Sequence, residues 1–280
     1  MSVARASLFI KLFILPCLLT LSCRAAAAQA TIAVASNFVA PMNALIEEFE
    51  ALSLHELRVV YGSSGRLFAQ ITNGAPFDVF LSADSVKPAR LIEDGYGVAG
   101  SQMTYAIGRL ALWSNKGSNK AIANLNIEEI LLNEDFSVIA IANPRLAPYG
   151  LAAKQSLESM GLWERVKSKL VQGENISQTY QFVFTGNADI GFVSYSQVRG
   201  ENSRQATNYL LVPSEYHEAI AQDSLLLERG AQNKASLAFI EFLKSNSAGK
   251  LIESFGYRRL ALGTAGQLDA LAQLSSLGQK

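Results

Sequence analysis

Short runs of apolar, often β-branched residues alternate along the chain with longer stretches in which apolar residues recur every three or four positions. This pattern predicts strands for the runs and helices for the stretches. The expected strands are 31–35, 57–61, 79–81, 103–114, 137–142 and 189–193. The expected helices follow positions 37 and 65 and then cover 127–132, 151–160, 164–171 and a stretch beginning within 173–176. Such alternation predicts an α/β protein whose mostly parallel sheets are covered by helices on both faces.

The first thirty residues have the pattern of a secretory leader. Arg5 and Lys11 precede the apolar run 12–21, and Ala28-Gln29-Ala30 has the small-x-small form that signal peptidase accepts, so we expect cleavage after Ala30. The run is shorter than the roughly 20 residues of a membrane-spanning helix, which makes a permanent anchor the weaker alternative. Lipidation at Cys23 is a second alternative, and the residues before it match that signal poorly.

Removal of this expected leader changes the net charge and the cysteine content of the chain. The 280 residues include 24 basic and 24 acidic side chains, two histidines and two cysteines, Cys17 and Cys23. Cleavage removes three basic residues, no acidic residue and both cysteines, so 21 basic and 24 acidic residues remain, a net charge of −3. Nucleic-acid binding, disulfides, zinc sites and cysteine catalysis are therefore disfavoured. The length fits two domains, or two lobes of one protein.

Small and hydroxyl-bearing residues gather at four points where a predicted strand passes into a helix. These junctions are Ser36-Asn37, Ser63-Ser64-Gly65, Ala147-Pro148-Tyr149-Gly150 and Glu174-Asn175-Ile176-Ser177. In open α/β sheets, ligands bind beyond the carboxyl ends of strands, where helix N-termini offer unpaired N–H groups. Four converging N-termini, each equivalent to about half a positive charge, would oppose about two negative charges. Ordinary helix capping is the alternative explanation for the serines.

Motifs of common enzymes are missing from the sequence, including a Gly-x-Ser-x-Gly elbow, HExxH, a Walker loop and a suitable GxGxxG. A secreted hydrolase with Ser64 as nucleophile remains an alternative. Its weakness is the lack of a base, because neither His55 nor His217 lies in a recognisable partner pattern.

Five segments, in order and at compatible spacing, carry a resemblance to a known family. They are VASNF (34–38), YGSSGRLFAQI (61–71), GAPFDVFLSAD (74–84), NPRLAPYG (143–150) and GNADIGFVSYS (186–196). Together they resemble the periplasmic molybdate-binding proteins of ABC uptake systems, from Thr31 to about Tyr257. The resemblance implies a two-lobed type II periplasmic-binding-protein fold with two crossing hinge strands. Lobe one would comprise 31–107 plus 217–280, and lobe two 108–216.

The same resemblance implies a function. The protein would be a periplasmic, monomeric binding protein, not an enzyme, that captures molybdate and tungstate in the cleft between its lobes. Neutral hydrogen-bond donors would hold the oxyanion without a cofactor and without direct metal-ion ligands, and the ligand would pass to a membrane permease and its ATPase. Binding of sulfate or another small anion by the same fold is the alternative. Residues after Tyr257 extend past the usual end of the family, and no role is assigned to them.

Residue by residue, the resemblance also implies a binding site. The positions that match the family's oxyanion ligands are Ser36, Asn37, Ser64, Tyr149 and Ile176, with Ser63 and Ser194 as weaker matches. Many family members have a tyrosine where Ser194 stands, and strand alternation is expected to point Tyr195 to the other side. We therefore expect the Tyr149 hydroxyl to replace the missing one from the opposite loop.

Overall fold

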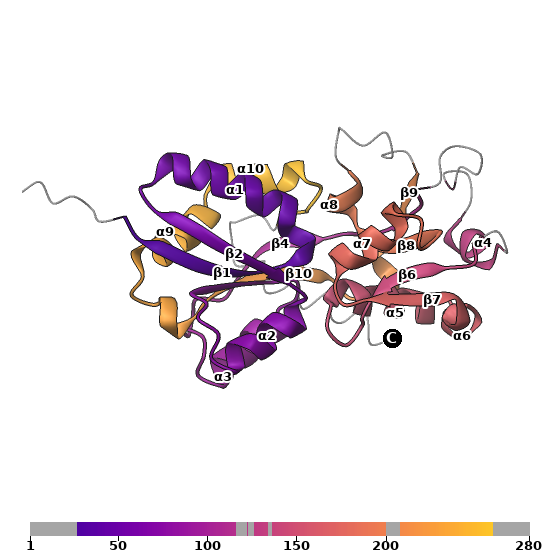
Figure 1. Cartoon of the computed structure of the whole chain (residues 1–280), viewed down its shortest axis with the longest axis horizontal. Helices are drawn as coiled ribbons and strands as arrows, with labels where there is room; N and C mark the ends of the chain where they lie inside the picture. The colour runs from indigo at the N-terminus through magenta and orange to yellow at the C-terminus, as the bar shows by residue number, and fades with distance from the viewer. Residues whose placement is uncertain (1–26, 116–121, 123–125, 134–135, 200–207, 260–280) are drawn as a thin grey trace, which may run out of the picture.

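A computed structural model describes residues 27–115, 122, 126–133, 136–199 and 208–259. Most of the expected leader, with Cys17 and Cys23, lies outside these residues, and so does the tail 260–280. The described residues form two α/β lobes that lie side by side, each built on one five-stranded sheet (Figure 1). The two-lobed α/β fold is thereby confirmed. Within the described ranges, no helix has the length and apolar character needed to cross a membrane.

The first sheet has the strand order β2-β1-β3-β10-β4. Its strands are β1 (Gln29–Ala35), β2 (Glu56–Gly62), β3 (Val79–Ser82), β4 (Met103–Gly108) and β10 (Ile220–Leu226). Its helices are α1 (Val39–Leu52), preceded by the 3-10 turn η1 (Ser36–Phe38), then α2 (Ser64–Thr72), α3 (Val86–Glu93), α9 (Lys234–Leu243) and α10 (Asn246–Ser254). Helices α1, α9 and α10 cover one face and α2 and α3 the other (Figure 1).

The second sheet has the order β7-β6-β8-β5-β9. Its strands are β5 (Leu110–Trp113), β6 (Ile139–Ala142), β7 (Leu170–Gly173), β8 (Ile190–Ser194) and β9 (Tyr209–Leu211). Its helices are α4 (Ile127–Leu132), α5 (Pro148–Ser159), α6 (Trp163–Val166), α7 (Ile176–Phe184) and α8 (Tyr195–Val198). Short 3-10 turns complete the list: η3 (Lys167–Lys169), η4 (Ser214–Tyr216) and η5 (Glu228–Gly230).

Both sheets are mixed rather than mostly parallel. In each, three strands pair in parallel and two further pairings are antiparallel. The antiparallel strands are those next to the two passages between the lobes, one from β4 to β5 and one from β9 to β10. The first strand that the chain forms on entering a sheet from the other lobe is β5 in lobe two and β10 in lobe one. Each of these strands runs antiparallel to the neighbouring strand of the strand–helix–strand units, β8 or β3.

Two expected elements differ from the structure. The single strand 103–114 is divided at Arg109 into β4 and β5, which belong to different sheets. The helix expected over 164–171 is wrong at its end, because Leu170 and Val171 lie in β7 and pair with Ile139 and Ala140 of β6. Pairing with a buried strand outweighs the local helical pattern.

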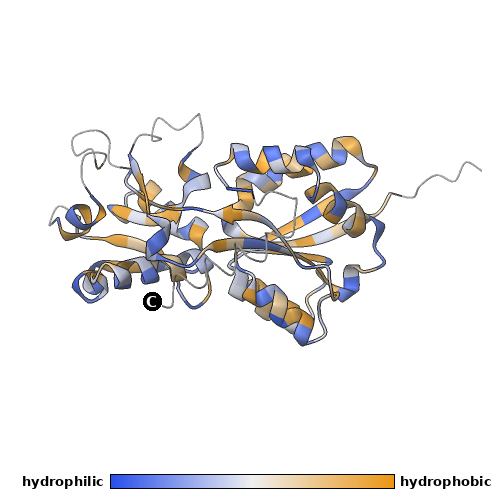
Figure 2. Ribbon diagram, turned by 180° about the vertical axis from the view of Figure 1, so that it is seen from behind, coloured by the Kyte–Doolittle hydropathy of each residue, from blue (hydrophilic) through white to orange (hydrophobic). Residues whose placement is uncertain are grey.

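Each lobe has its own hydrophobic core on the two faces of its sheet. In lobe one, Phe38, Leu45 and Phe239 pack on the face covered by α1 and α9, and Leu67 and Phe80 on the other face. Hydrophobic positions accordingly concentrate along the strands of both lobes (Figure 2). The cluster of lobe two also includes Ala35, Ala83 and Ile220, so the two cores meet at the cleft. Most of each core nevertheless lies within its own lobe, which is the arrangement of domains that move about a hinge.

Candidate functional site

A small pocket lies between the lobes, at the N-termini of four helical segments. Eleven residues line it: Ala35, Ser36, Asn37, Gly62, Ser63, Ser64, Ala83, Ala147, Pro148, Tyr149 and Ile176. Its empty volume is about 180 Å³. A space of this size holds one water or one small ion rather than an organic molecule. The structure thus brings together residues that are up to 141 positions apart in the sequence, from Ala35 to Ile176.

Lobe one contributes the ends of β1 and β2 and the helical turns that follow them. Ser36 and Asn37 form η1, and Ser63 precedes the first residue of α2, Ser64. Neither helical start has a side-chain cap hydrogen bond, so ordinary capping does not explain these serines. The Ser64 Oγ is fully buried and accepts a hydrogen bond from the Ala83 N–H at 2.9 Å. Since that bond uses a lone pair, the Ser64 hydroxyl hydrogen stays available for a ligand.

Lobe two contributes the starts of α5 and α7. Pro148 is the first residue of α5, where its missing N–H costs nothing. A Cβ on Gly150 would lie 2.2 Å from the Ala142 carbonyl oxygen, so only glycine allows this helix to start so close to β6. At α7, the Asn175 side chain caps the Gln178 N–H, which leaves the N–H of Ile176 at the pocket.

Tyr149 lines the pocket with its hydroxyl held at the rear of the site. This hydroxyl accepts a hydrogen bond from the Ser194 Oγ at 3.0 Å. It also lies so near Gly108, in the first passage between the lobes, that a Cβ at Gly108 would be 2.2 Å from it. Burial, followed by the field of Tyr257, raises the pKa of Tyr149 well above its ordinary value, so the hydroxyl stays protonated and can donate.

Ser194 and Tyr195 have different surroundings, because β8 ends at Ser194 and Tyr195 begins α8 rather than continuing the strand. Ser194 does not line the pocket and supports Tyr149 from behind. Tyr195 begins α8 and turns away from the site, with its ring beneath the Arg109 guanidinium and beside the Tyr209 ring. It therefore does not replace the tyrosine that the resemblance leads one to expect at position 194.

The Asn37 side chain points into lobe one, although its sequence position led us to expect it at the ligand. Its side-chain Nδ2 donates to the Gln222 Oε1 at 2.7 Å and to the Tyr257 hydroxyl at 2.9 Å, both buried in lobe one. Both amide hydrogens of the side chain are thus used, so the backbone N–H is the donor that Asn37 can still offer to the pocket. Sequence reasoning missed Gln222 and Tyr257, because they follow no strand–helix junction. It also missed Ser196, a partner of Tyr257, which lies at the β8–α8 junction rather than at one of the four predicted junctions.

No charged side chain lines the pocket. Arg66, beside the second junction, forms an exposed ion pair with Glu174 of the other lobe at 3.0 Å. Arg145 is exposed, as expected for an arginine near a first helical turn. Among the described residues there is also no cluster of three or more histidine, cysteine or carboxylate side chains of the kind that holds a metal ion. Electrostatic attraction at this pocket must come from backbone N–H groups and hydroxyls.

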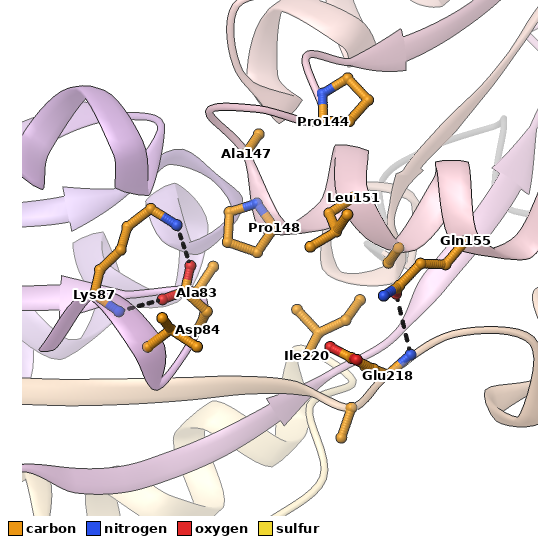
Figure 3. A pocket seen from close by; sticks show the side chains of 13 residues that line it. Ala83, Asp84, Lys87, Pro144, Ala147, Pro148, Leu151, Gln155, Glu218 and Ile220 are labelled. Atoms are coloured by element: carbon orange, nitrogen blue, oxygen red, sulfur yellow. Dashed lines mark hydrogen bonds and ion pairs between the residues drawn. The ribbon is translucent and has the colours of Figure 1, made fainter. Parts of the chain in front are cut away.

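A larger hollow adjoins the small pocket and shares Ala83, Ala147 and Pro148 with it (Figure 3). Its empty volume is about 630 Å³, and Leu151 and Ile220 form part of its apolar wall. The one cation in its lining, Lys87, is already paired with Asp84 at 2.6 Å. This hollow gives access to the cleft but lacks the converging donors of the small pocket.

A pair of α/β lobes with a small, uncharged pocket of hydrogen-bond donors between them is the architecture of a solute-binding protein. The model for the family described as bacterial extracellular solute-binding protein matches residues 30–258, and the chain belongs to that family.

Individual relatives place the chain within this family. It is 43% identical to the molybdate-binding protein ModA of Azotobacter vinelandii over 85% of the chain and 92% of the relative. It is 41% identical to ModA of Rhodobacter capsulatus, over 83% and 89%. The solved periplasmic molybdate-binding protein of Azotobacter vinelandii superposes with a TM-score of 0.77 at 33% identity, covering 81% of this chain and 98% of that one. The resemblance to periplasmic molybdate-binding proteins is confirmed.

Proposed function

We propose that this protein captures molybdate, and with it tungstate, in the pocket between its lobes and delivers it to an ABC permease and its ATPase. The observation that carries the proposal is the convergence of four helical N-termini, with the Ser64 hydroxyl, on a pocket without charged lining residues. The identity to molybdate-binding relatives supports the same ligand. We further propose that it acts as a periplasmic monomer, without a cofactor and without catalysis.

Neutral donors suit such a ligand on physical grounds. An anion leaves water only where fixed donors replace its hydration, and hydrogen bonds to a charged acceptor are the stronger ones. Phosphate carries a proton near neutral pH, and a pocket made only of donors leaves that proton without an acceptor. Sulfate has the same charge and shape as molybdate, but its shorter bonds do not reach a rigid ring of donors spaced for the larger ion.

Calorimetric titration of the processed protein with molybdate, tungstate, sulfate and phosphate tests this function. Molybdate and tungstate are expected to bind tightly, sulfate much more weakly, and phosphate not measurably. Tight sulfate binding without a molybdate response would overturn the proposal in favour of the sulfate alternative.

The hydrolase alternative lacks a base beside Ser64. Both histidines of the chain are described, and each is engaged elsewhere: the His55 Nδ1 accepts from the Ala28 N–H, and the His217 Nδ1 lies 2.7 Å from the Glu218 carbonyl oxygen. A serine without a neighbouring base is a poor nucleophile. Turnover of ester substrates by the purified protein would revive this alternative.

The Tyr149 oxygen accepts from the Ser194 Oγ, and its hydroxyl also has a hydrogen bond with Tyr257. We expect the hydroxyl hydrogen to turn from Tyr257 to the bound oxyanion, because a charged acceptor gives the stronger hydrogen bond. Replacement of Tyr149 by phenylalanine should weaken molybdate binding by roughly tenfold, the effect of losing one hydrogen bond to a charged acceptor. Calorimetric titration of Tyr149→Phe with molybdate measures this loss. Tyr105→Phe is the control, because the Tyr105 hydroxyl is buried without a partner in the described structure. Unchanged affinity in Tyr149→Phe would show that this hydroxyl only supports the pocket.

The proposed periplasmic location depends on removal of a leader, and the fold bears on where cleavage falls. Strand β1 already begins at Gln29, and buried Ala30 pairs with Leu57. The Ala28 carbonyl also accepts from the Glu56 N–H at 3.0 Å. Cleavage after Ala30, as the sequence indicates, would remove these contacts. We propose cleavage after Ala27, where Ala25 and Ala27 give the same small-x-small pattern.

Mass spectrometry of the protein secreted from its leader-bearing precursor reads the first residue directly. The expected N-terminus is Ala28. A chain that starts at Thr31 would support the site indicated by the sequence instead, and a retained, lipid-modified Cys23 would support anchoring.

A further inference from the structure

Two serines of lobe two bind the backbone of the η1 segment in lobe one. The Ser177 Oγ, from α7, donates to the Ser36 carbonyl oxygen at 3.0 Å. The Ser196 Oγ, from α8, donates to the Asn37 carbonyl oxygen at 3.1 Å. Neither serine lines the small pocket, whereas both residues that they bind do. Consecutive peptide groups of a pocket-lining segment are thus held from the opposite lobe.

These bonds constrain the donors of the pocket. In a trans peptide the C=O and the following N–H point in opposite directions within one plane. Fixing the carbonyls of Ser36 and Asn37 therefore fixes the orientation of the next N–H groups in η1. Hydrogen bonding at a carbonyl also polarises the peptide group and strengthens its N–H as a donor.

Ser196 further connects the two halves of the site. Its Oγ lies 2.8 Å from the Ser194 Oγ, which donates to Tyr149 in lobe two. It also lies 3.2 Å from the Tyr257 hydroxyl, which donates to the Asn37 carbonyl oxygen in lobe one. Each hydroxyl has one hydrogen, so the contacts of Ser196 with Ser194 and Tyr257 are alternatives to the hydrogen bonds that those hydroxyls donate elsewhere. All five residues are buried, so water does not compete within this network as it does at the exposed Arg66–Glu174 pair.

We propose that Ser177 and Ser196 are positioning residues that latch the lobes together and orient the η1 donors, without touching the ligand. The proposal rests on the proposed function, because it concerns the same site. Its consequence is that part of the affinity for molybdate is generated outside the pocket, by bonds that form only when the lobes are closed.

The test compares Ser177→Ala, Ser196→Ala and the double variant with Ser236→Ala. Ser236, in α9 of lobe one, is the matched control because its Oγ is buried without a partner in the described structure. Molybdate association and dissociation rates are measured by stopped-flow, and affinity by calorimetry. Ser177→Thr, which keeps the hydroxyl, is the conservative variant for rescue.

Removal of the Ser177 and Ser196 hydrogen bonds should destabilise the closed form of the protein. Ser196→Ala is expected to weaken molybdate binding about tenfold and partly exposed Ser177→Ala about threefold, almost entirely through faster dissociation. Ser177→Thr should restore the wild-type dissociation rate, and Ser236→Ala should match wild type throughout. Equal dissociation rates in the latch variants and in Ser236→Ala would overturn the proposal.

A second readout separates the latch from the identity of the ligand. The processed chain lacks cysteine, so Glu47→Cys in α1 and Ser159→Cys in α5 carry a pair of spin labels, one on each lobe. Without ligand, the latch variants should show a larger fraction of long interlobe distances than Ser236→Ala. If the wild-type protein does not bind molybdate but the interlobe distances still lengthen in the latch variants, the proposed function fails and the latch stands. If the wild-type protein binds molybdate and these distances do not lengthen, the latch fails.

Discussion

Replacement of Ser64 by alanine is expected to weaken molybdate binding by roughly 100-fold. The Ser64 Oγ accepts from the Ala83 N–H at 2.9 Å, an arrangement that directs its own hydrogen elsewhere. A hydrogen bond to a charged acceptor contributes about 1.5–3 kcal/mol, and 1.4 kcal/mol corresponds to tenfold in affinity. Ser64 is fully buried, so no water replaces the lost donor without a cost. Calorimetric titration with molybdate measures the loss.

Ser63→Ala and Ser236→Ala are the comparisons for this variant. Ser63 lines the pocket but makes no cap hydrogen bond, so a smaller loss is expected there, and Ser236 lies away from the cleft. Affinity within threefold of wild type for Ser64→Ala would contradict the assignment of this hydroxyl as a ligand donor. A parallel fall in the melting temperature of the ligand-free protein would point to the Ala83 N–H left without a partner.

Gly65→Ala is expected to weaken binding by roughly 10- to 100-fold without touching the ligand. The Gly65 N–H donates to the Leu146 carbonyl oxygen of the other lobe at 2.8 Å. A Cβ at Gly65 would lie 2.9 Å from that oxygen and 3.0 Å from the Leu146 Cα, both backbone atoms that cannot turn aside. Overpacking of this kind costs about 1–3 kcal/mol, and here the cost falls only on the closed form.

Ligand-free stability is the internal control for Gly65→Ala. Alanine is up to about 1 kcal/mol better than glycine inside a helix, so lobe one should be as stable as before or slightly more so. The expected pair of results is therefore an unchanged or higher melting temperature of the ligand-free protein and a reduced molybdate affinity. Wild-type affinity in this variant would mean that the ligand does not require the lobes to approach as closely as they do in the structure.

Much of the fold could be predicted from the sequence. Apolar runs such as 31–35 and 79–81 became buried central strands, and the helix expected over 127–132 has the same bounds in the structure. The predicted elements were wrong where the local sequence pattern competes with pairing to a strand that is distant in the sequence. Leu170 and Val171 follow a short helical stretch but join β6 as an edge strand, and 103–114 divides between two sheets. The local residues of these segments do not indicate which strand or sheet they will join, so the pairings could not be predicted from them.

The pocket-lining positions could be predicted from the sequence, whereas the residues that support them could not. Ser36, Asn37, Ser64, Tyr149 and Ile176 all line the pocket, because each follows a strand end, where parallel units bring such junctions together. The role of Asn37 differed, since its side chain turns to Gln222 and Tyr257. Tyr257 lies in a C-terminal segment with no junction pattern, and only the packing of that segment against Phe38 reveals it.

The sequence by itself determined the α/β class and the small and hydroxyl residues at four strand ends. It also predicted that, once the expected leader is removed, the chain is slightly acidic, without cysteine and poor in histidine, a composition that disfavours nucleic-acid binding and zinc sites. These follow from periodicity and composition, which are local or additive properties. The tertiary structure decided that the four strand ends share one pocket, that the sheets are mixed, and that Ser177 and Ser196 hold lobe one from across the cleft. Such contacts join residues up to 159 positions apart. The sheet pairings form within each lobe and the serine contacts form only when the lobes close, and no local pattern encodes either geometry.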